Sequence, residues 1–341
     1  MNKFDEKYDF KFANLDDVDV IMSFIESEWK SNHIFAKNKD FFLYEFAEGN
    51  HINFVIAINK ETNELDGILG YLPSSKDKEC LDVWGVMWKV TSKRAIMPFL
   101  GIELMKRLIQ MTGCRTEIGI GANPKTSNPL LKMMLKFWTG KMKHYYRLSD
   151  RNEFKIAKIK EIRKVKKISS CAYTLKRYND IDELTVDFNF EERKAVRPYK
   201  DSWYINKRFF KHLIYRYNIY GACSSKGKIE AIVIGRQVKC NDSKILRIVD
   251  FIGNEKVFSG LYDAFSELLK EYEYIDFYCY GLDSNYVKNA GFVEKNENDI
   301  NIIPNYFEPF VQCNVDIWIN SSKENCIFFK ADGDQDRPNF Y

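Results

Sequence analysis

The 341-residue chain lacks the features that mark metalloproteins, membrane proteins and nucleic-acid-binding proteins. Its eight cysteines are scattered without a Cys-x-x-Cys pair or a Cys/His cluster, which argues against a zinc site and a disulfide framework. No apolar run approaches the length of a membrane span, and the N-terminus has no signal-peptide core. The net charge of +4 is too small to indicate nucleic acid or a membrane surface as the main partner. We therefore predict a cytoplasmic protein without a metal.

Apolar and aromatic residues are plentiful, at 45% and 15% of the chain, so large cores can form. The length fits two domains of moderate size. We place them at residues 1–155 and 156–341, with the boundary in the lysine-rich "NEFKIAKIKEIRKVKK". A charge run of this kind is more often a solvated face than a phosphate site.

The two halves repeat one order of elements. Apolar residues at helical spacing and alternating strand patterns give strand, helix, helix, three strands, helix, strand, helix and strand. In the first half these elements cover residues 8–15, 15–30, 39–49, 52–59, 66–73, 81–92, 97–113, 115–123, 128–140 and 141–149. The second half follows the same order from residue 168. We therefore predict an α+β fold of two similar units in tandem, each a mixed, mostly antiparallel sheet flanked by helices.

This order of elements resembles that of the GNAT acyltransferases. The resemblance implies that acyl-CoA lies between two parallel strands that separate, with its pyrophosphate at the N-terminus of the next helix. The implied residues are Met87, Trp88, Lys89, Val90, Lys93, Arg94 and Gly101. The loop departs from the family's Arg/Gln-x-x-Gly-x-Gly/Ala pattern because its middle glycine is missing. In the second half Glu255 stands at the corresponding helix start and would repel a phosphate, so we assign CoA to the first half.

Four longer stretches resemble tandem-GNAT enzymes of bacterial surface-polysaccharide biosynthesis. They are "ESEWKSNHIFAKNKDFF", "MKHYYRLSDRNEFKIAKI", "YINKRFFKHLIYRYNIY" and "FFKADGDQDRPN". The resemblance implies an N-acyltransferase that moves an acyl group, 3-hydroxybutanoyl in the nearest type, from acyl-CoA to the amine of a dTDP-linked amino-dideoxyhexose.

Such a reaction needs a base that deprotonates the amine. His33 is one candidate, because imidazole titrates in the required range. A loop histidine that caps a helix fits the same position equally well. Asp82, at the start of the strand beside CoA, is the second candidate, although a turn residue is the simpler interpretation. Tyr145 could protonate the departing thiolate, or it packs in a half-buried strand.

Acceptor binding is predicted for residues of both halves. Trp84 has a ring that can stack on a sugar or base, and the second-half residues offer charge. The polar candidates are Arg208, Lys211, His212, Asp332, Asp334, Asp336 and Arg337. The tail aspartates do not fit a calcium loop, since the sixth and twelfth positions are wrong. We predict instead that the tail closes over the substrate.

Two rival interpretations remain open. One is a FemABX-type aminoacyltransferase, which also has two GNAT units but uses aminoacyl-tRNA. The other is a non-catalytic pair of GNAT units that serves as a binding module. The sequence leaves the oligomeric state undetermined.

Overall fold

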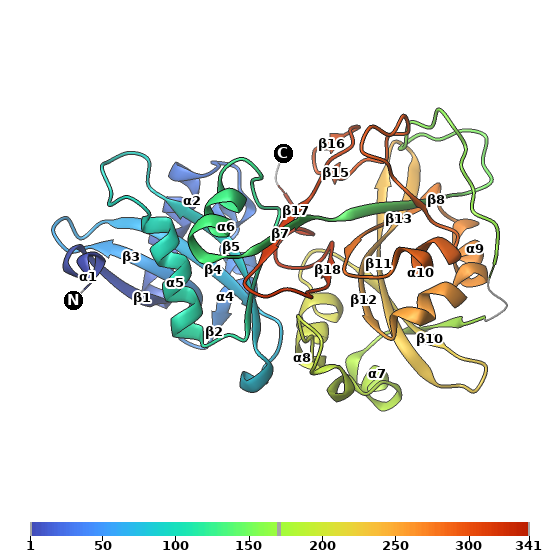
Figure 1. Ribbon diagram of the computed structural model, residues 1–341, viewed down its shortest axis with the longest axis horizontal. Coiled ribbons are helices and arrows are strands. Elements are labelled where there is room, and N and C mark those ends of the chain that lie inside the picture. Colours follow the sequence, from blue (N-terminus) through green and yellow to red (C-terminus); the bar gives the residue numbers. More distant parts are fainter. Residues whose placement is uncertain (1, 169–171, 340–341) are drawn as a thin grey trace. The chain divides into compact units, whose positions relative to one another are not determined.

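Two eight-stranded mixed sheets dominate the computed structural model, which describes residues 2–168 and 172–339 (Figure 1). Both sheets carry flanking helices, so the predicted α+β fold of two similar units is confirmed. None of the described helices is both long and apolar enough to cross a membrane. Seven cysteines are described and all are free thiols, while Cys171 lies outside the described residues.

The first sheet has the strand order β1-β3-β4-β5-β6-β17-β7, with β2 paired to β3. Its strands are β1 (Tyr8–Asn14), β2 (Ala47–Glu48), β3 (His51–Asn59), β4 (Leu65–Pro73), β5 (Asp82–Val90), β6 (Thr116–Ile120), β7 (Trp138–Lys141) and β17 (Trp318–Ser321). The helices are α1 (Lys3–Lys7), α2 (Val18–Glu28), α3 (Ile34–Lys37), α4 (Lys39–Phe46), α5 (Leu100–Thr112) and α6 (Ser127–Leu135), with 3-10 turns at η1 (Leu15–Asp17) and η2 (Lys78–Cys80).

The helices of this unit cover both faces of its sheet. Val55 of β3 packs in a core cluster with the buried face of α5, while the neighbouring Phe54 contacts Phe46 of α4. Successive strand residues point to opposite faces, so α4 and α5 lie on opposite sides. The α5 side is the one that matters for the site described below.

The second sheet has the order β14-β8-β13-β12-β11-β10-β9, with β18 paired to β13. Its strands are β8 (Lys143–Leu148), β9 (Thr174–Tyr178), β10 (Tyr217–Cys223), β11 (Ile229–Cys240), β12 (Ser243–Gly253), β13 (Tyr274–Tyr280), β14 (Val293–Glu294) and β18 (Phe328–Phe329); β15 (Tyr306–Phe307) and β16 (Phe310–Val311) form a separate pair. The helices are α7 (Ile181–Asp187), α8 (Ser202–Ile205), α9 (Tyr262–Leu269) and α10 (Ser284–Asn289), with 3-10 turns η3 (Phe190–Arg193) and η5 (Glu255–Gly260) and the π-helical η4 (Asn206–Phe210).

Each sheet contains one strand from the other half of the chain. β8 follows the first half directly but pairs with β13 of the second sheet, where its green ribbon lies beside orange strands in Figure 1. β17, close to the C-terminus, pairs antiparallel with β6 of the first sheet. The two halves have thus exchanged one strand each.

The exchange determines where the compact units divide. One unit runs to Thr139 and adds Ile319–Glu324 and a short stretch from Arg337, and the other comprises Gly140–Trp318 and Asn325–Asp336. The sequence placed the division at 155/156 because residues 141–149 read as the closing strand of the first half. Their pairing partner is in the second sheet instead.

Candidate active site

The parallel pair β5–β6 of the first unit is short. Asp82 to Gly85 of β5 pair with Thr116 to Gly119 of β6, and Gly85–Gly119 is the last pair. Beyond it β5 continues to Val90 and is paired only with β4 among the described residues. The edge of β5 that faces away from β4 is therefore open from Val86 onward.

A bulge changes the course of β5 within this open stretch. The register with β4 shifts between Ile68 and Gly70, and Met87 adopts a left-handed backbone with φ of 51°. Bulges re-aim strand groups and are frequent beside active sites. Main-chain N–H and C=O groups of residues 86–90 are thus presented at an edge that an extended ligand can join as a further strand.

Glu117 of β6 lies where the two strands separate. Its residue is 1% exposed, and neither carboxylate oxygen meets hydrogen-bond geometry with any described residue. Gly85 provides the room, since a Cβ there would lie 2.4 Å from Oε1 of Glu117. Burial raises the pKa of this carboxyl to about 8, and the nearby Gly85 N–H lowers it only in part. Glu117 is thus a buried carboxyl that titrates near neutrality.

A second unsatisfied acceptor lies beside it. Asn320 of β17 pairs with Gly119, and its amide fills the space over that glycine, with Oδ1 2.6 Å from where a Cβ would be. Its Nδ2 donates to Oδ1 of Asn128 at 3.0 Å, whereas its own Oδ1 has no hydrogen-bond partner among the described residues. Gly85 and Gly119 are paired, and neighbouring strands lie about 4.8 Å apart. The Glu117 carboxyl and the Asn320 amide therefore lie over adjacent glycines on the α5 side.

The loop between β5 and α5 is held by the carboxylates of Glu28 and Asp66. Glu28, the last residue of α2, accepts hydrogen bonds from Thr91 Oγ1 and from the N–H and Oγ of Ser92 at 2.9–3.2 Å. Burial acts to raise the pKa of Glu28, but these bonds outweigh it and the pKa is lowered overall. An anion thus already occupies part of this loop.

The predicted basic residues of the loop are also paired. Lys93 lies 3.7 Å from Glu28, and Arg94 binds Asp66 at 2.5 Å and the carbonyl of Leu65 at 2.9 Å. Gly101 accepts a hydrogen bond from Trp88 Nε1 at 2.9 Å. The loop and the bulged strand are therefore tied together.

The second unit has a counterpart of this opening, and its own chain fills it. β12 and β13 are parallel over three pairs, Leu246–Ile275 to Ile248–Phe277. Beyond these pairs β18 joins β13 through Phe328 and Phe329, and the N–H of Ala331 donates to the carbonyl of Val249 in β12 at 2.9 Å. The C-terminal segment thus bonds to both strands of the second unit, at the position that corresponds to the opening in the first unit.

Buried ion pairs fix this segment. Lys200 binds both Asp250 and Asp332 at 2.6 Å, and Asp336 forms a bidentate pair with Arg236. Arg208 donates to the carbonyl of Asp336 at 3.1 Å. Asp332, Asp336 and Arg208, which the sequence assigned to substrate, therefore hold the segment in the second unit.

The chain matches no protein-family model, and no curated protein matches its sequence. Solved structures resemble it in fold. A GCN5-related N-acetyltransferase from Anabaena variabilis gives a TM-score of 0.58 at 11% identity, over 92% of this chain and 72% of that one. A protein of unknown function from Enterococcus faecalis, described as a probable N-acyltransferase, gives 0.55 at 12% identity, over 92% and 71%. The chain has a GNAT fold.

Both predicted bases make hydrogen bonds within the first unit. His33 is the N-cap of α3, where its Nδ1 accepts a hydrogen bond from the N–H of Phe35 at 3.2 Å. Asp82 is buried and binds Arg115 through both oxygens, at 2.5 and 3.1 Å. The capping role that the sequence allowed for His33 is therefore present.

The remaining predicted side chains are dispersed. Trp84 is fully buried on β5, and Tyr145 belongs to the core of the second unit, where its hydroxyl donates to Ser284 at 2.9 Å and burial raises its pKa. His212 is buried and accepts from the N–H groups of Ile214 and Tyr215, and burial, with help from Arg208, lowers its pKa to about 3. Lys211 is exposed, Asp334 is buried and Arg337 is half-buried.

Sequence reasoning missed Glu117 and Asn320. "TEIGI" reads as an alternating strand in which Glu117 and Gly119 share the polar face, and a polar face is normally solvated. The sequence did contain one signal, the glycines Gly85 and Gly119 in two neighbouring strands, because glycine in a strand leaves room for a nearby side chain. No cluster of three or more His, Cys, Asp or Glu side chains suited to a metal occurs in the part of the chain that the structure describes.

Proposed function

We propose that this chain is an N-acyltransferase that moves an acyl group from acyl-CoA to an amine at the opening between β5 and β6. One observation carries the proposal: a bulged, unpaired strand edge lies beside the buried Glu117 and Asn320 acceptors. The GNAT fold supports it. The filled opening of the second unit supports placing acyl-CoA in the first unit, because β18 already uses the strand edge there.

The edge of β5 supplies main-chain donors and acceptors to the pantetheine of acyl-CoA. N–H groups near Met87 to Lys89 stabilise the oxyanion that forms on the thioester carbonyl. Val90 belongs to the end of this strand edge. If the loop residues Lys93 and Arg94 bind the acyl-CoA phosphates, the phosphates share the loop with the carboxylates of Glu28 and Asp66.

Glu117 acts as the general base in this proposal, in place of His33 and Asp82. Its carboxylate takes a proton from the acceptor ammonium, and Asn320 Oδ1 accepts a second N–H. The free amine attacks the thioester carbon and forms the C–N bond, and collapse of the oxyanion breaks the C–S bond. The nitrogen then loses its second proton to solvent, and the departing thiolate takes a proton from solvent. A thiolate leaves readily, so no role is required of Tyr145.

We further propose that the acceptor is the amino group of a dTDP-linked amino-dideoxyhexose and that the donor is 3-hydroxybutanoyl-CoA. The resemblance of four long stretches to nucleotide-sugar N-acyltransferases supports this choice. An amine suits a base whose pKa is about 8, because base and acceptor then exchange a proton without a large energy difference.

The test is release of CoA thiol, measured with a thiol reagent. Acetyl-CoA and 3-hydroxybutanoyl-CoA are each combined with a panel of dTDP-linked amino sugars. We expect release that depends on both the acyl-CoA and an amino sugar. Release with simple amines but no sugar would leave the acyltransferase class and remove the sugar assignment. No release with any pair would contradict the proposal and favour an aminoacyl-tRNA donor or a binding role.

A further inference from the structure

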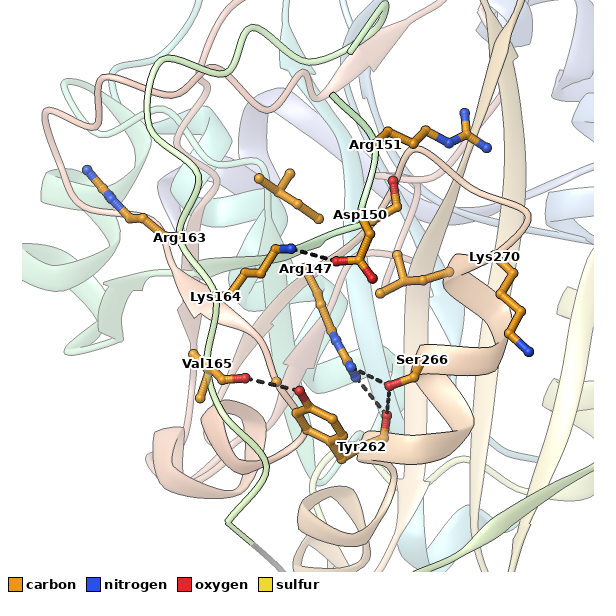
Figure 2. Close-up of a pocket in the computed structure, with 13 residues that line it drawn as sticks. Arg147, Asp150, Arg151, Arg163, Lys164, Val165, Tyr262, Ser266 and Lys270 are labelled. Carbon is orange, nitrogen blue, oxygen red and sulfur yellow. Dashed lines mark hydrogen bonds and ion pairs between the residues drawn. The ribbon is translucent and has the colours of Figure 1, made fainter. Parts of the chain in front are cut away.

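A cavity of about 420 Å³ lies in the second unit, where the lysine-rich segment after β8 passes the start of α9 (Figure 2). Its volume is in the range of small-molecule sites. Five basic side chains and one acidic side chain contribute to its lining: Arg147, Arg151, Arg163, Lys164, Lys270 and Asp150. The cavity is thus strongly basic and is separate from the opening between β5 and β6.

Arg147 lies at the centre of the lining and is 9% exposed. Its guanidinium donates to the carbonyls of Tyr262 and Ala290 at 2.8 and 2.9 Å and to the hydroxyl of Ser266 at 2.5 Å. It also lies 4.1 Å from the centroid of the Tyr262 ring, and Figure 2 shows it directed towards Ser266 and Tyr262. These contacts fix the group in one position.

No described carboxylate is in direct contact with Arg147, although the charges of Asp150 and Asp263 act on it from a greater distance. All its hydrogen-bond acceptors are uncharged, and it forms no ion pair with a described carboxylate. A buried charge is unfavourable unless an opposite charge accompanies it, and burial lowers the pKa of this arginine. Gly291, with φ of +92°, leaves space against the guanidinium, since a Cβ there would lie 2.8 Å from Nε. The fixed cation is therefore suited to an anion from outside the chain.

The other basic groups can be released to a ligand. Lys164 pairs with Asp150, and Lys270 with Glu267, between side chains that are at least half exposed. Such pairs contribute little to stability. Arg151 donates to the main-chain carbonyl of Glu271 at 3.4 Å and has no ion pair among the described residues. Arg163, held by Asp299 and Glu161, is the one that is firmly paired.

We propose that this cavity is a binding site for a phosphorylated ligand of about nucleotide size. A phosphate offers an anion for direct contact with Arg147, and the guanidinium group of arginine is well suited to bind phosphate. The volume exceeds the need of one phosphate, so a diphosphate or a nucleotide fits better than a free ion. The proposal is independent of acyl transfer, because it concerns binding to the second unit alone.

The experiment is calorimetric titration of the full chain with pyrophosphate, with dTDP and with uncharged thymidine. The variant Arg151→Ala/Lys270→Ala removes two exposed charges from the cavity. The control variant Lys226→Ala/Lys239→Ala removes two exposed charges of the same unit that do not line it. Circular dichroism confirms that all three proteins are folded equally.

We expect saturable binding of pyrophosphate or dTDP by the wild type and the control, and at least about tenfold weaker binding by the cavity variant. Tighter binding of dTDP than of pyrophosphate would identify a nucleotide, and equal binding would identify the phosphates alone; both support the proposal. Equal affinity of the cavity variant and the control, no saturable binding by the wild type, or binding of thymidine as tight as that of dTDP would overturn it.

Discussion

Replacement of Glu117 by glutamine tests the proposed base in two independent ways. The amide has nearly the same shape as the carboxyl but does not take a proton. Loss of a positioned general base costs about 10²- to 10⁴-fold, so we expect kcat for acyl transfer to fall by at least about a hundredfold. Because the wild-type base must be ionised, kcat/KM should rise with pH and level off above the pKa of about 8.

Although Glu117→Gln should lower activity, it should raise the free energy of unfolding at high pH. The pKa of Glu117 is raised by folding, from 4.5 to about 8, so the folded state favours the protonated carboxyl. Wild-type stability is therefore unaffected by this group below pH 4.5 and decreases as pH rises towards 8. The full shift corresponds to at most about 5 kcal/mol. The glutamine variant avoids this loss, so it should be more stable than the wild type at pH 9 and similar at pH 4.

The assays are thiol release across pH and urea unfolding at pH 4 and pH 9. Asp82→Asn serves as the matched control, because Asp82 is a buried carboxylate of the same sheet whose charge is satisfied by Arg115. It should be destabilised at neutral pH without the gain at pH 9. The reasoning is refuted if Glu117→Gln keeps activity within about threefold of the wild type, or if it is the less stable protein at pH 9.

Three further predictions concern other parts of the molecule. His33→Ala should lower the melting temperature through loss of an N-cap, worth about 1 kcal/mol, yet leave the pH profile of kcat/KM unchanged; a hundredfold loss of kcat would restore His33 as the base. Glu28→Gln should tighten CoA binding in calorimetry, because it removes a negative charge beside the predicted phosphate loop; weaker binding would contradict this placement. Asp336→Asn should lower the free energy of unfolding by about 3–5 kcal/mol, since it leaves Arg236 buried without its partner. Arg236 holds the pKa of Asp336 well below its usual value although burial opposes it, so in urea unfolding the wild type should lose this advantage as pH falls below about 4.

The local pattern of the sequence was enough to predict most elements and the fold. The apolar runs of β3, β4 and β5 and the helical spacing in α2 and α5 match the structure. The partner of a strand is a different matter. β8 reads as the last strand of the first half, and only its pairing with β13 shows the exchange. Pairing between distant segments depends on packing that no local pattern contains.

The binding of acyl-CoA by the main chain of β5 stays a prediction, and the structure adds side chains that the sequence did not indicate. The structure shows that the predicted strand is bulged at Met87 and, as the sequence led us to expect, is followed by a loop. The charged residues chosen for chemistry are largely used inside the protein, as Asp336 with Arg236 and Asp82 with Arg115 show. A sequence shows that a residue is charged, but not whether a partner already neutralises it. Glu117 was overlooked for the converse reason, because its isolation becomes visible only after folding.

The central claim, that acyl-CoA binds along β5 of the first unit, is tested most directly by hydrogen–deuterium exchange with and without acyl-CoA. The claim predicts slower exchange of amides in residues 86–99, which cover the bulge and the following loop, and unchanged exchange in residues 249–255 of the second unit. Protection of residues 249–255 with no change in residues 86–99 would contradict it.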